Sequence, residues 1–152
     1  MKNNIENGIY IPDEHRNLIP VDEWVKREDP TAAQAVVLVT DSGMLEIAKK
    51  DLPGLFNFED AQKAAAEYSE GFRCPTRREA IEMYDARFRG LDEAFEKIGG
   101  KPAISVGWTN EADPDPEYNS LSAFTYSGFT GSVSDNSKDT TNAVRPVSTF
   151  KK

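Results

Sequence analysis

The side chains that most often carry catalysis are scarce in this sequence. Its 152 residues include one cysteine, Cys74, and one histidine, His15. A nucleophilic site needs an activated serine or cysteine beside a base, and zinc sites use several cysteines and histidines. The sequence offers no Ser-His-Asp set and no glycine-rich phosphate loop, and His15 lies in a charged, turn-like segment. We therefore predict a non-enzymatic protein without a cofactor or a metal site.

Cys74 keeps one chemical alternative open. It stands before Pro75 at a predicted helix entrance, with Arg73, Arg77 and Arg78 close in sequence. Such surroundings favour a thiolate. A small packed side chain is the commoner role of a lone cysteine, and we favour that interpretation.

An acidic loop offers a second alternative. Four carboxylates alternate between prolines and could supply oxygen ligands to a calcium ion. Their spacing does not match the EF-hand loop, so we favour a solvated acidic loop. These residues are Glu111, Asp113, Asp115 and Glu117.

Aromatic and small polar residues gather in the last third of the chain. Trp108 ends a predicted strand, and further aromatics follow among Ser, Thr, Gly and Asn. This mixture is typical of binding loops, where aromatic rings supply contact area and small polar groups adapt. A tryptophan at the end of a strand is usually a core residue, so we place Trp108 at the floor of the site. The predicted ligand-binding residues are Trp108, Asn110, Tyr118, Asn119, Tyr126 and Phe129, in loops over residues 109–142.

Composition excludes several classes of protein. Acidic residues outnumber basic ones by 26 to 18, giving a net charge of −8, which disfavours binding to nucleic acid. No apolar run approaches the length of a membrane span, so no membrane partner is expected. The first residues lack the apolar core of a secretory signal, and we expect a cytoplasmic or virion-associated protein. The length fits one domain over residues 1–152.

The first half of the chain predicts strands and then helices. Residues 1–35 predict an irregular segment with one short strand at 8–11, anchored by Trp24. Residues 36–40 and 44–48 predict a β-hairpin. Its first strand is apolar and should be buried on both faces, and its second alternates and should show one face to water.

Two helices should follow the hairpin. Asn57 is a predicted N-cap for a helix that ends before Gly71, and Thr76 with Glu79 forms a capping box for a second helix up to residue 98. An apolar stripe in the second helix should pack on the sheet of the domain. The stripe consists of Ile81, Tyr84, Phe88, Leu91, Phe95 and Ile98. Short strands are then expected at 104–108, 121–127, 129–134 and 143–150, and the whole order predicts an α+β fold.

Several motifs, taken in order, resemble bacterial and phage domains with the C-type-lectin-like fold, of the formylglycine-generating-enzyme and phage tropism-determinant types. They are Arg73-Cys74-Pro75-Thr76-Arg77-Arg78-Glu79-Ala80, Gly99-Gly100, Gly107-Trp108-Thr109-Asn110-Glu111 and Asn142-Ala143-Val144-Arg145-Pro146-Val147. The resemblance covers residues 36–150. It implies a hairpin, two helices and a twisted antiparallel sheet with long polar loops, in which the N- and C-terminal strands pair and residues 144–147 form the closing strand. Arg145 should lie across an aromatic ring or pair with a carboxylate.

The same resemblance implies a choice of functions, because the fold hosts glycan binders, protein-binding domains and a few enzymes. The enzymes of this group depend on active-site cysteines or metal ligands, which Cys74 alone does not supply. The calcium-binding pattern of animal lectins is also missing. We predict a non-catalytic module that presents loops 109–142 to a glycan or protein partner. The alternative is a structural or assembly component, of phage or virion origin, and a homo-oligomer stays open.

Overall fold

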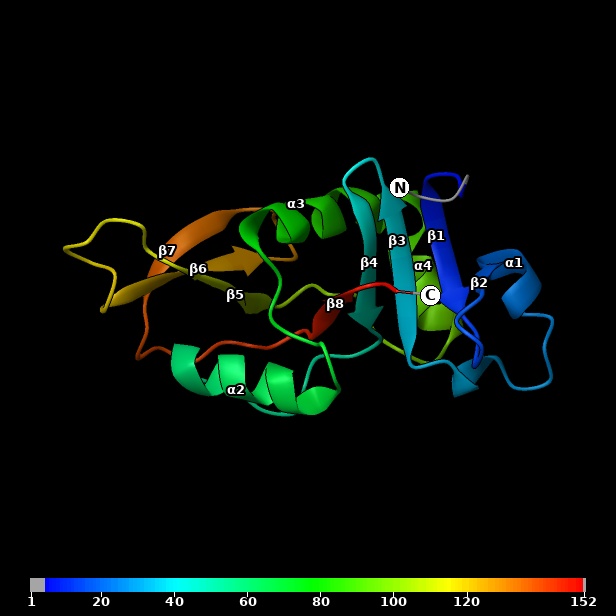
Figure 1. The fold of residues 1–152 in the computed structure, drawn as a ribbon, viewed down its shortest axis with the longest axis horizontal. Coiled ribbons are helices and arrows are strands. Elements are labelled where there is room, and N and C mark those ends of the chain that lie inside the picture. The colour runs from blue at the N-terminus through cyan, green and yellow to red at the C-terminus, as the bar shows by residue number, and fades with distance from the viewer. Residues whose placement is uncertain (1–4, 152) are drawn as a thin grey trace.

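The chain builds two antiparallel sheets and places helices against them in the computed structural model, which describes residues 5–151 (Figure 1). This confirms the predicted α+β class. One sheet has the strand order β2-β1-β3-β4-β8 and the other has the order β5-β6-β7. The strands are β1 (Gly8–Pro12), β2 (Leu18–Pro20), β3 (Ala35–Thr40), β4 (Gly43–Ala48), β5 (Val106–Ala112), β6 (Ser122–Ser127), β7 (Val133–Ser137) and β8 (Val147–Thr149).

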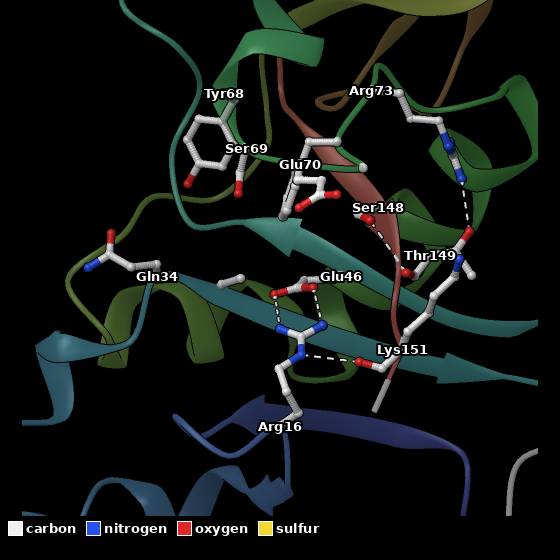
Figure 2. A pocket seen from close by; sticks show the side chains of 13 residues that line it. Arg16, Gln34, Glu46, Tyr68, Ser69, Glu70, Arg73, Ser148, Thr149 and Lys151 are labelled. Atoms are coloured by element: carbon white, nitrogen blue, oxygen red, sulfur yellow. Dashed lines mark hydrogen bonds and ion pairs between the residues drawn. The ribbon is translucent and has the colours of Figure 1, made fainter.

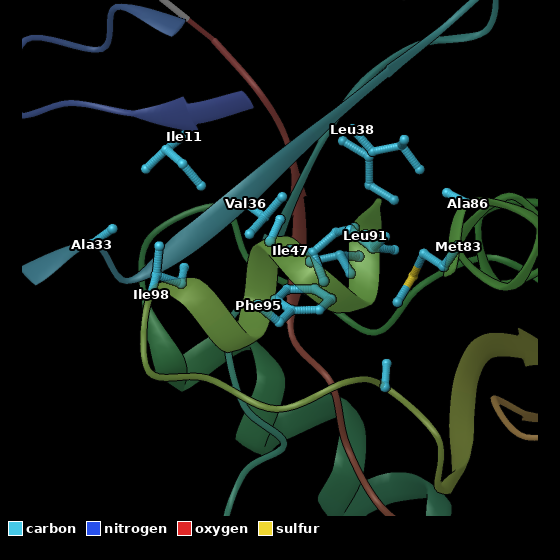
Figure 3. Close-up of a cluster of buried hydrophobic side chains, with 14 of the residues drawn as sticks. Ile11, Ala33, Val36, Leu38, Ile47, Met83, Ala86, Leu91, Phe95 and Ile98 are labelled. Atoms are coloured by element: carbon cyan, nitrogen blue, oxygen red, sulfur yellow. The ribbon is translucent and has the colours of Figure 1, made fainter. Parts of the chain in front are cut away.

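The β3–β4 hairpin is the centre of the larger sheet. Its register runs from Ala35 opposite Ala48 to Thr40 opposite Gly43, which confirms the predicted hairpin. The first five residues of β3 are buried, as an apolar central strand requires. One face packs on the helices, with Val36, Leu38 and Ile47 in the main core (Figure 3).

The N-terminal segment is more regular than predicted. Besides β1, it contains β2, the short helix α1 (Val21–Trp24) and the 3-10 turn η1 (Pro30–Ala32). The Trp24 ring is buried, and its Nε1 donates a hydrogen bond of 2.8 Å to the Pro30 carbonyl. This confirms the predicted anchoring role of Trp24.

Both predicted helix starts are confirmed. In α2 (Phe58–Tyr68) the Asn57 side chain accepts from the Asp60 amide at 2.9 Å. In α3 (Arg77–Ala86) Thr76 and Glu79 form the reciprocal capping box.

The prediction of a single helix from residue 76 to residue 98 is wrong. The chain breaks into α3, the 3-10 turn η2 (Arg87–Arg89) and α4 (Leu91–Lys97). Gly90 makes the break at φ 116°, a conformation that glycine adopts readily. The apolar stripe is divided too: Leu91, Phe95 and Ile98 enter the core, whereas Ile81 and Phe88 are exposed.

The C-terminal third contains more sheet than the predicted loops allow. Residues 109–112, 122–127 and 133–137 lie in β5, β6 and β7. The strand predicted at 121–127 is confirmed, and the strand predicted at 129–134 runs over 133–137 instead, so much of the region predicted to present loops is sheet. The closing strand β8 pairs with β4 rather than with the N-terminal strand β1, which corrects the expected pairing of the terminal strands. Within residues 5–151, no helix is long and apolar enough to cross a membrane.

Arg145 joins the segments between the two sheets. Its guanidinium lies 4.5 Å from the centre of the Phe95 ring and pairs with Asp51 at 3.0 Å. It also donates to the carbonyl oxygens of Ala48, Lys49 and Lys101. Both interactions expected of Arg145 are therefore confirmed. Its buried guanidinium has one carboxylate and three carbonyl oxygens as hydrogen-bond acceptors.

Candidate functional site

Two of the six predicted ligand-binding residues belong to the core. Trp108 is fully buried, stacks edge-on against Phe58 at 5.4 Å and donates from Nε1 to the Phe56 carbonyl at 2.7 Å. Tyr126 is also buried, and its ring lies against Gly107 of the neighbouring strand. The structure therefore places both rings in the core rather than at the surface.

The other four predicted residues are exposed, and they do not form a pocket with one another. Asn110 lies within β5, and Tyr118 and Asn119 lie in the turn before β6. Phe129 is in the turn between β6 and β7. These positions offer surface contact groups, and none of the four residues lines the cleft described below.

Three of the four carboxylates of the acidic segment accept hydrogen bonds. Glu111 accepts from the backbone amide and guanidinium of Arg77, and Asp113 and Asp115 each accept the backbone amide two residues ahead. In the described part of the chain, no group of three or more His, Cys, Asp or Glu side chains is arranged to hold a metal ion. The loop is ordered by its own turns.

Cys74 is a packed core residue. It is fully buried, and its Sγ lies 3.7 Å from the Ala61 carbonyl oxygen. Burial raises the pKa of the Cys74 thiol to about 12. The structure therefore supports the packing role over the thiolate alternative.

We expect the Cys74 thiol of the folded protein to resist a disulfide-exchange reagent at pH 8. The Cys74 thiol should react with the reagent on the order of a thousandfold more slowly than an exposed cysteine does. Little of it is ionised to the thiolate at this pH, and the surrounding core keeps the reagent away. Absorbance of the released thiol gives the rate, and the same protein in denaturant is the control. Rapid stoichiometric labelling of the native protein would instead support the alternative that Cys74 is a reactive thiolate.

A polar cleft of about 850 Å³ lies on the outer face of the larger sheet, opposite the main core. Figure 2 shows Tyr68, Ser69 and Glu70 on one side, Arg16 on the other, and Glu46 between them. The cleft is thus built from segments far apart in the sequence. Its remaining lining residues are Gln34, Ala35, Gly71, Phe72, Arg73, Ser148, Thr149 and Lys151.

Glu46 and Arg16 form the floor of the cleft. The alternation of β4 directs Leu45 and Ile47 to the core and Glu46 to the outer face, where it is only 6% exposed. Arg16 Nη1 and Nη2 donate to both carboxylate oxygens at 3.1 and 2.9 Å. The prediction that the Glu46 face of β4 meets water is therefore wrong, because this ion pair covers it.

The turn at 13–17 presents Arg16 to the cleft. Within residues 5–151, Arg16 is the one non-glycine residue with positive φ, at 65°. Asp13 stabilises the turn by accepting the backbone amides of His15 and Asn17, each at 2.8 Å. His15 itself is exposed, as predicted. The guanidinium of Arg16 then lies 4.4 Å from the centre of the Phe150 ring, which fixes its direction.

The opposite wall follows the C-terminus of α2. The backbone of Arg73 exchanges two hydrogen bonds of 2.8 Å with Val147 in β8, which fastens this wall to the sheet. Burial, and next the charge of Glu46, raise the pKa of Tyr68, so its hydroxyl remains a protonated donor at neutral pH. Tyr68 packs edge-on against Phe72 at 5.1 Å, which leaves one part of its ring open to the cleft.

The charges of the cleft nearly cancel. Arg16 is paired with Glu46, and Arg73 with Glu79 at 2.6 Å. Glu70 and Lys151 remain without an ion pair in the described part of the chain, and they have opposite signs. The cleft lining therefore combines three cations with two carboxylates, and Glu79 outside the lining balances Arg73, although the whole protein carries −8.

Sequence reasoning missed this site for a clear reason. The signal was Glu46 alone in an otherwise apolar strand, but its partner Arg16 lies 30 positions away in a segment predicted to be irregular. The cleft wall follows a helix end whose contact with β8 depends on tertiary structure. None of the six predicted residues lines the cleft.

A scan against known protein families finds no match, and a search of curated proteins finds none either. We therefore base the proposed function on the geometry of the site.

Proposed function

We propose that this protein is a non-catalytic recognition module that binds a neutral glycan in the cleft between Arg16 and Tyr68. The observation that carries the proposal is a cleft of about 850 Å³ with hydroxyl, amide and paired charged groups on both walls. Pockets of this size commonly take small ligands, and a few placed polar groups set their orientation. Sugar hydroxyls both donate and accept, which fits the mixed lining.

The near balance of positive and negative charge in the cleft favours a neutral ligand. An anionic ligand would meet Glu46 and Glu70, and a cationic one would meet Arg16 and Lys151. Both charges of the Arg16–Glu46 pair are already satisfied by each other, so the pair serves as a fixed set of hydrogen-bonding atoms. The exposed ring of Tyr68 adds an apolar surface for a sugar face.

The cleft also supports a role in binding rather than in catalysis. Glu46 is its most buried carboxylate, and Arg16 holds both of its oxygens. A catalytic carboxyl group must reach the substrate to donate or accept a proton, and both oxygens of Glu46 are already hydrogen-bonded to Arg16. The one histidine and the one cysteine lie outside the cleft lining.

We include the resemblance to C-type-lectin-like domains in this proposal. It is supported by the hairpin, the two helical units and the antiparallel strands that follow them in this order. A protein partner docking on the exposed residues of 109–142 is the competing outcome of the test below.

We expect Tyr68→Ala to weaken glycan binding by roughly tenfold to a hundredfold, as loss of an aromatic contact residue does. The probe is an array of immobilised neutral glycans, followed by titration calorimetry with the glycan that binds best. Binding should persist with a chelator present, because the cleft uses side-chain groups and no ion.

Tyr118→Ala is the matched control. Tyr118 is 46% exposed and Tyr68 is 39% exposed, and Tyr118 lies outside the cleft. Equal binding by Tyr118→Ala and the wild type is the expected result. Loss of binding in Tyr118→Ala with none in Tyr68→Ala would move the site to the loops.

A further inference from the structure

The outward side of α3 and of the η2 turn that follows it carries apolar residues that the core does not use. Ile81 is 52% exposed and Phe88 is 73% exposed. Tyr84 lies between them on the same side of the helix, and its ring contacts Phe88 edge-on at 6.2 Å. These three residues are the half of the predicted apolar stripe that the break at Gly90 leaves outside the core.

The turn between β6 and β7 extends this apolar surface. Arg87 Nη1 donates to the Gly128 carbonyl at 2.6 Å, and Gly131 approaches the Tyr84 ring so closely that a Cβ would lie 2.6 Å from it. Phe129 lies between these two contacts and is 71% exposed. We call Ile81, Tyr84, Phe88 and Phe129 the apolar strip.

The size of the apolar strip suits a protein interface. Its side chains expose roughly 400 Å² of apolar surface, which is within the range of functional patches on soluble proteins. A standard interface buries about 800 Å² per partner, of which about 65% is apolar in homodimers. The apolar strip therefore supplies most of the apolar centre that such an interface needs.

The charge around the apolar strip differs from that of the rest of the protein. The segment formed by α3 and η2 has four arginines and three acidic residues, whereas the whole chain carries −8. Two copies of an acidic protein repel each other least where their facing surfaces carry no excess of acidic residues. The charged residues of the segment are Arg77, Arg78, Arg87, Arg89, Glu79, Glu82 and Asp85.

We propose that the apolar strip binds the same strip of a second copy of this chain, forming a two-fold dimer. A two-fold interface brings the same patch of both subunits together, so a single apolar face is sufficient. None of the four residues lines the cleft, and the dimer is independent of what the cleft binds.

Light scattering coupled to size-exclusion chromatography tests the dimer. The wild type should give about twice the chain mass of 16.9 kDa, and Phe88→Ser and Phe129→Ser should each give the chain mass. The dissociation constant of the dimer, from sedimentation equilibrium, should rise at least roughly tenfold in either variant.

Leu55→Ser and Leu121→Ser are the matched controls, because these leucines are 65% and 61% exposed and lie outside the apolar strip. Both should remain dimeric, and circular dichroism should show that every variant is folded. A wild type that stays monomeric at all concentrations would overturn the proposal. A dimer that survives both phenylalanine substitutions would also overturn it.

Discussion

Arg145→Met is expected to lower the free energy of unfolding by about 3–5 kcal/mol, the usual cost of breaking a buried ion pair from one side. Arg145 is 1% exposed, and it is the partner of Asp51 and of three backbone carbonyls. Methionine replaces the apolar stem but satisfies none of these acceptors. The stacking on Phe95 is lost as well.

Urea denaturation followed by tryptophan fluorescence measures this change. Arg78→Met is the control, because Arg78 makes an exposed helical pair with Glu82 and should cost less than about 1 kcal/mol. If the two variants have equal stability, Arg145 does not join the segments between the two sheets.

Trp108→Ala is expected to lower the free energy of unfolding by about 3–5 kcal/mol, as for other buried aromatic residues. The change leaves a cavity beside Phe58 and removes the hydrogen bond to the Phe56 carbonyl. Trp108→Phe keeps part of the packing and should cost less.

Tyr118→Ala again supplies the comparison, since an exposed turn residue should change stability by less than about 0.5 kcal/mol. Denaturation curves and glycan binding are measured on the same samples. If Trp108→Ala has normal stability but no longer binds the glycan, Trp108 is a ligand contact rather than a core residue.

Local signals predicted the local structure well. The Asn57 cap and the Thr76–Glu79 box depend on neighbouring residues only, and both form as expected. The β3–β4 hairpin follows from two apolar runs around a short turn. The dual contacts of Arg145 were expected in kind, although the sequence did not identify Asp51 or Phe95 as its partners.

Long-range contacts account for what the sequence did not reveal. A spacing of three and four extended the apolar stripe through Gly90, but the chain breaks there. The helix α3 packs through Ala80, Met83 and Ala86, which leaves Ile81 and Phe88 outside the core. Tyr126 was predicted to contact a ligand because its neighbours are small and polar, yet it lies buried on β6, the central strand of the smaller sheet. The Glu46–Arg16 pair joins segments whose contact no periodicity describes.

The most direct test of the central claim is a map of where a glycan binds. Amide chemical shifts of isotopically labelled protein are followed by NMR during titration with the best neutral glycan from the array. Binding in the cleft predicts shifts at Glu46, Ser69, Gly71 and Ser148, with little change over residues 113–121. Shifts confined to 113–121 and 128–131, with the cleft unchanged, would contradict the account.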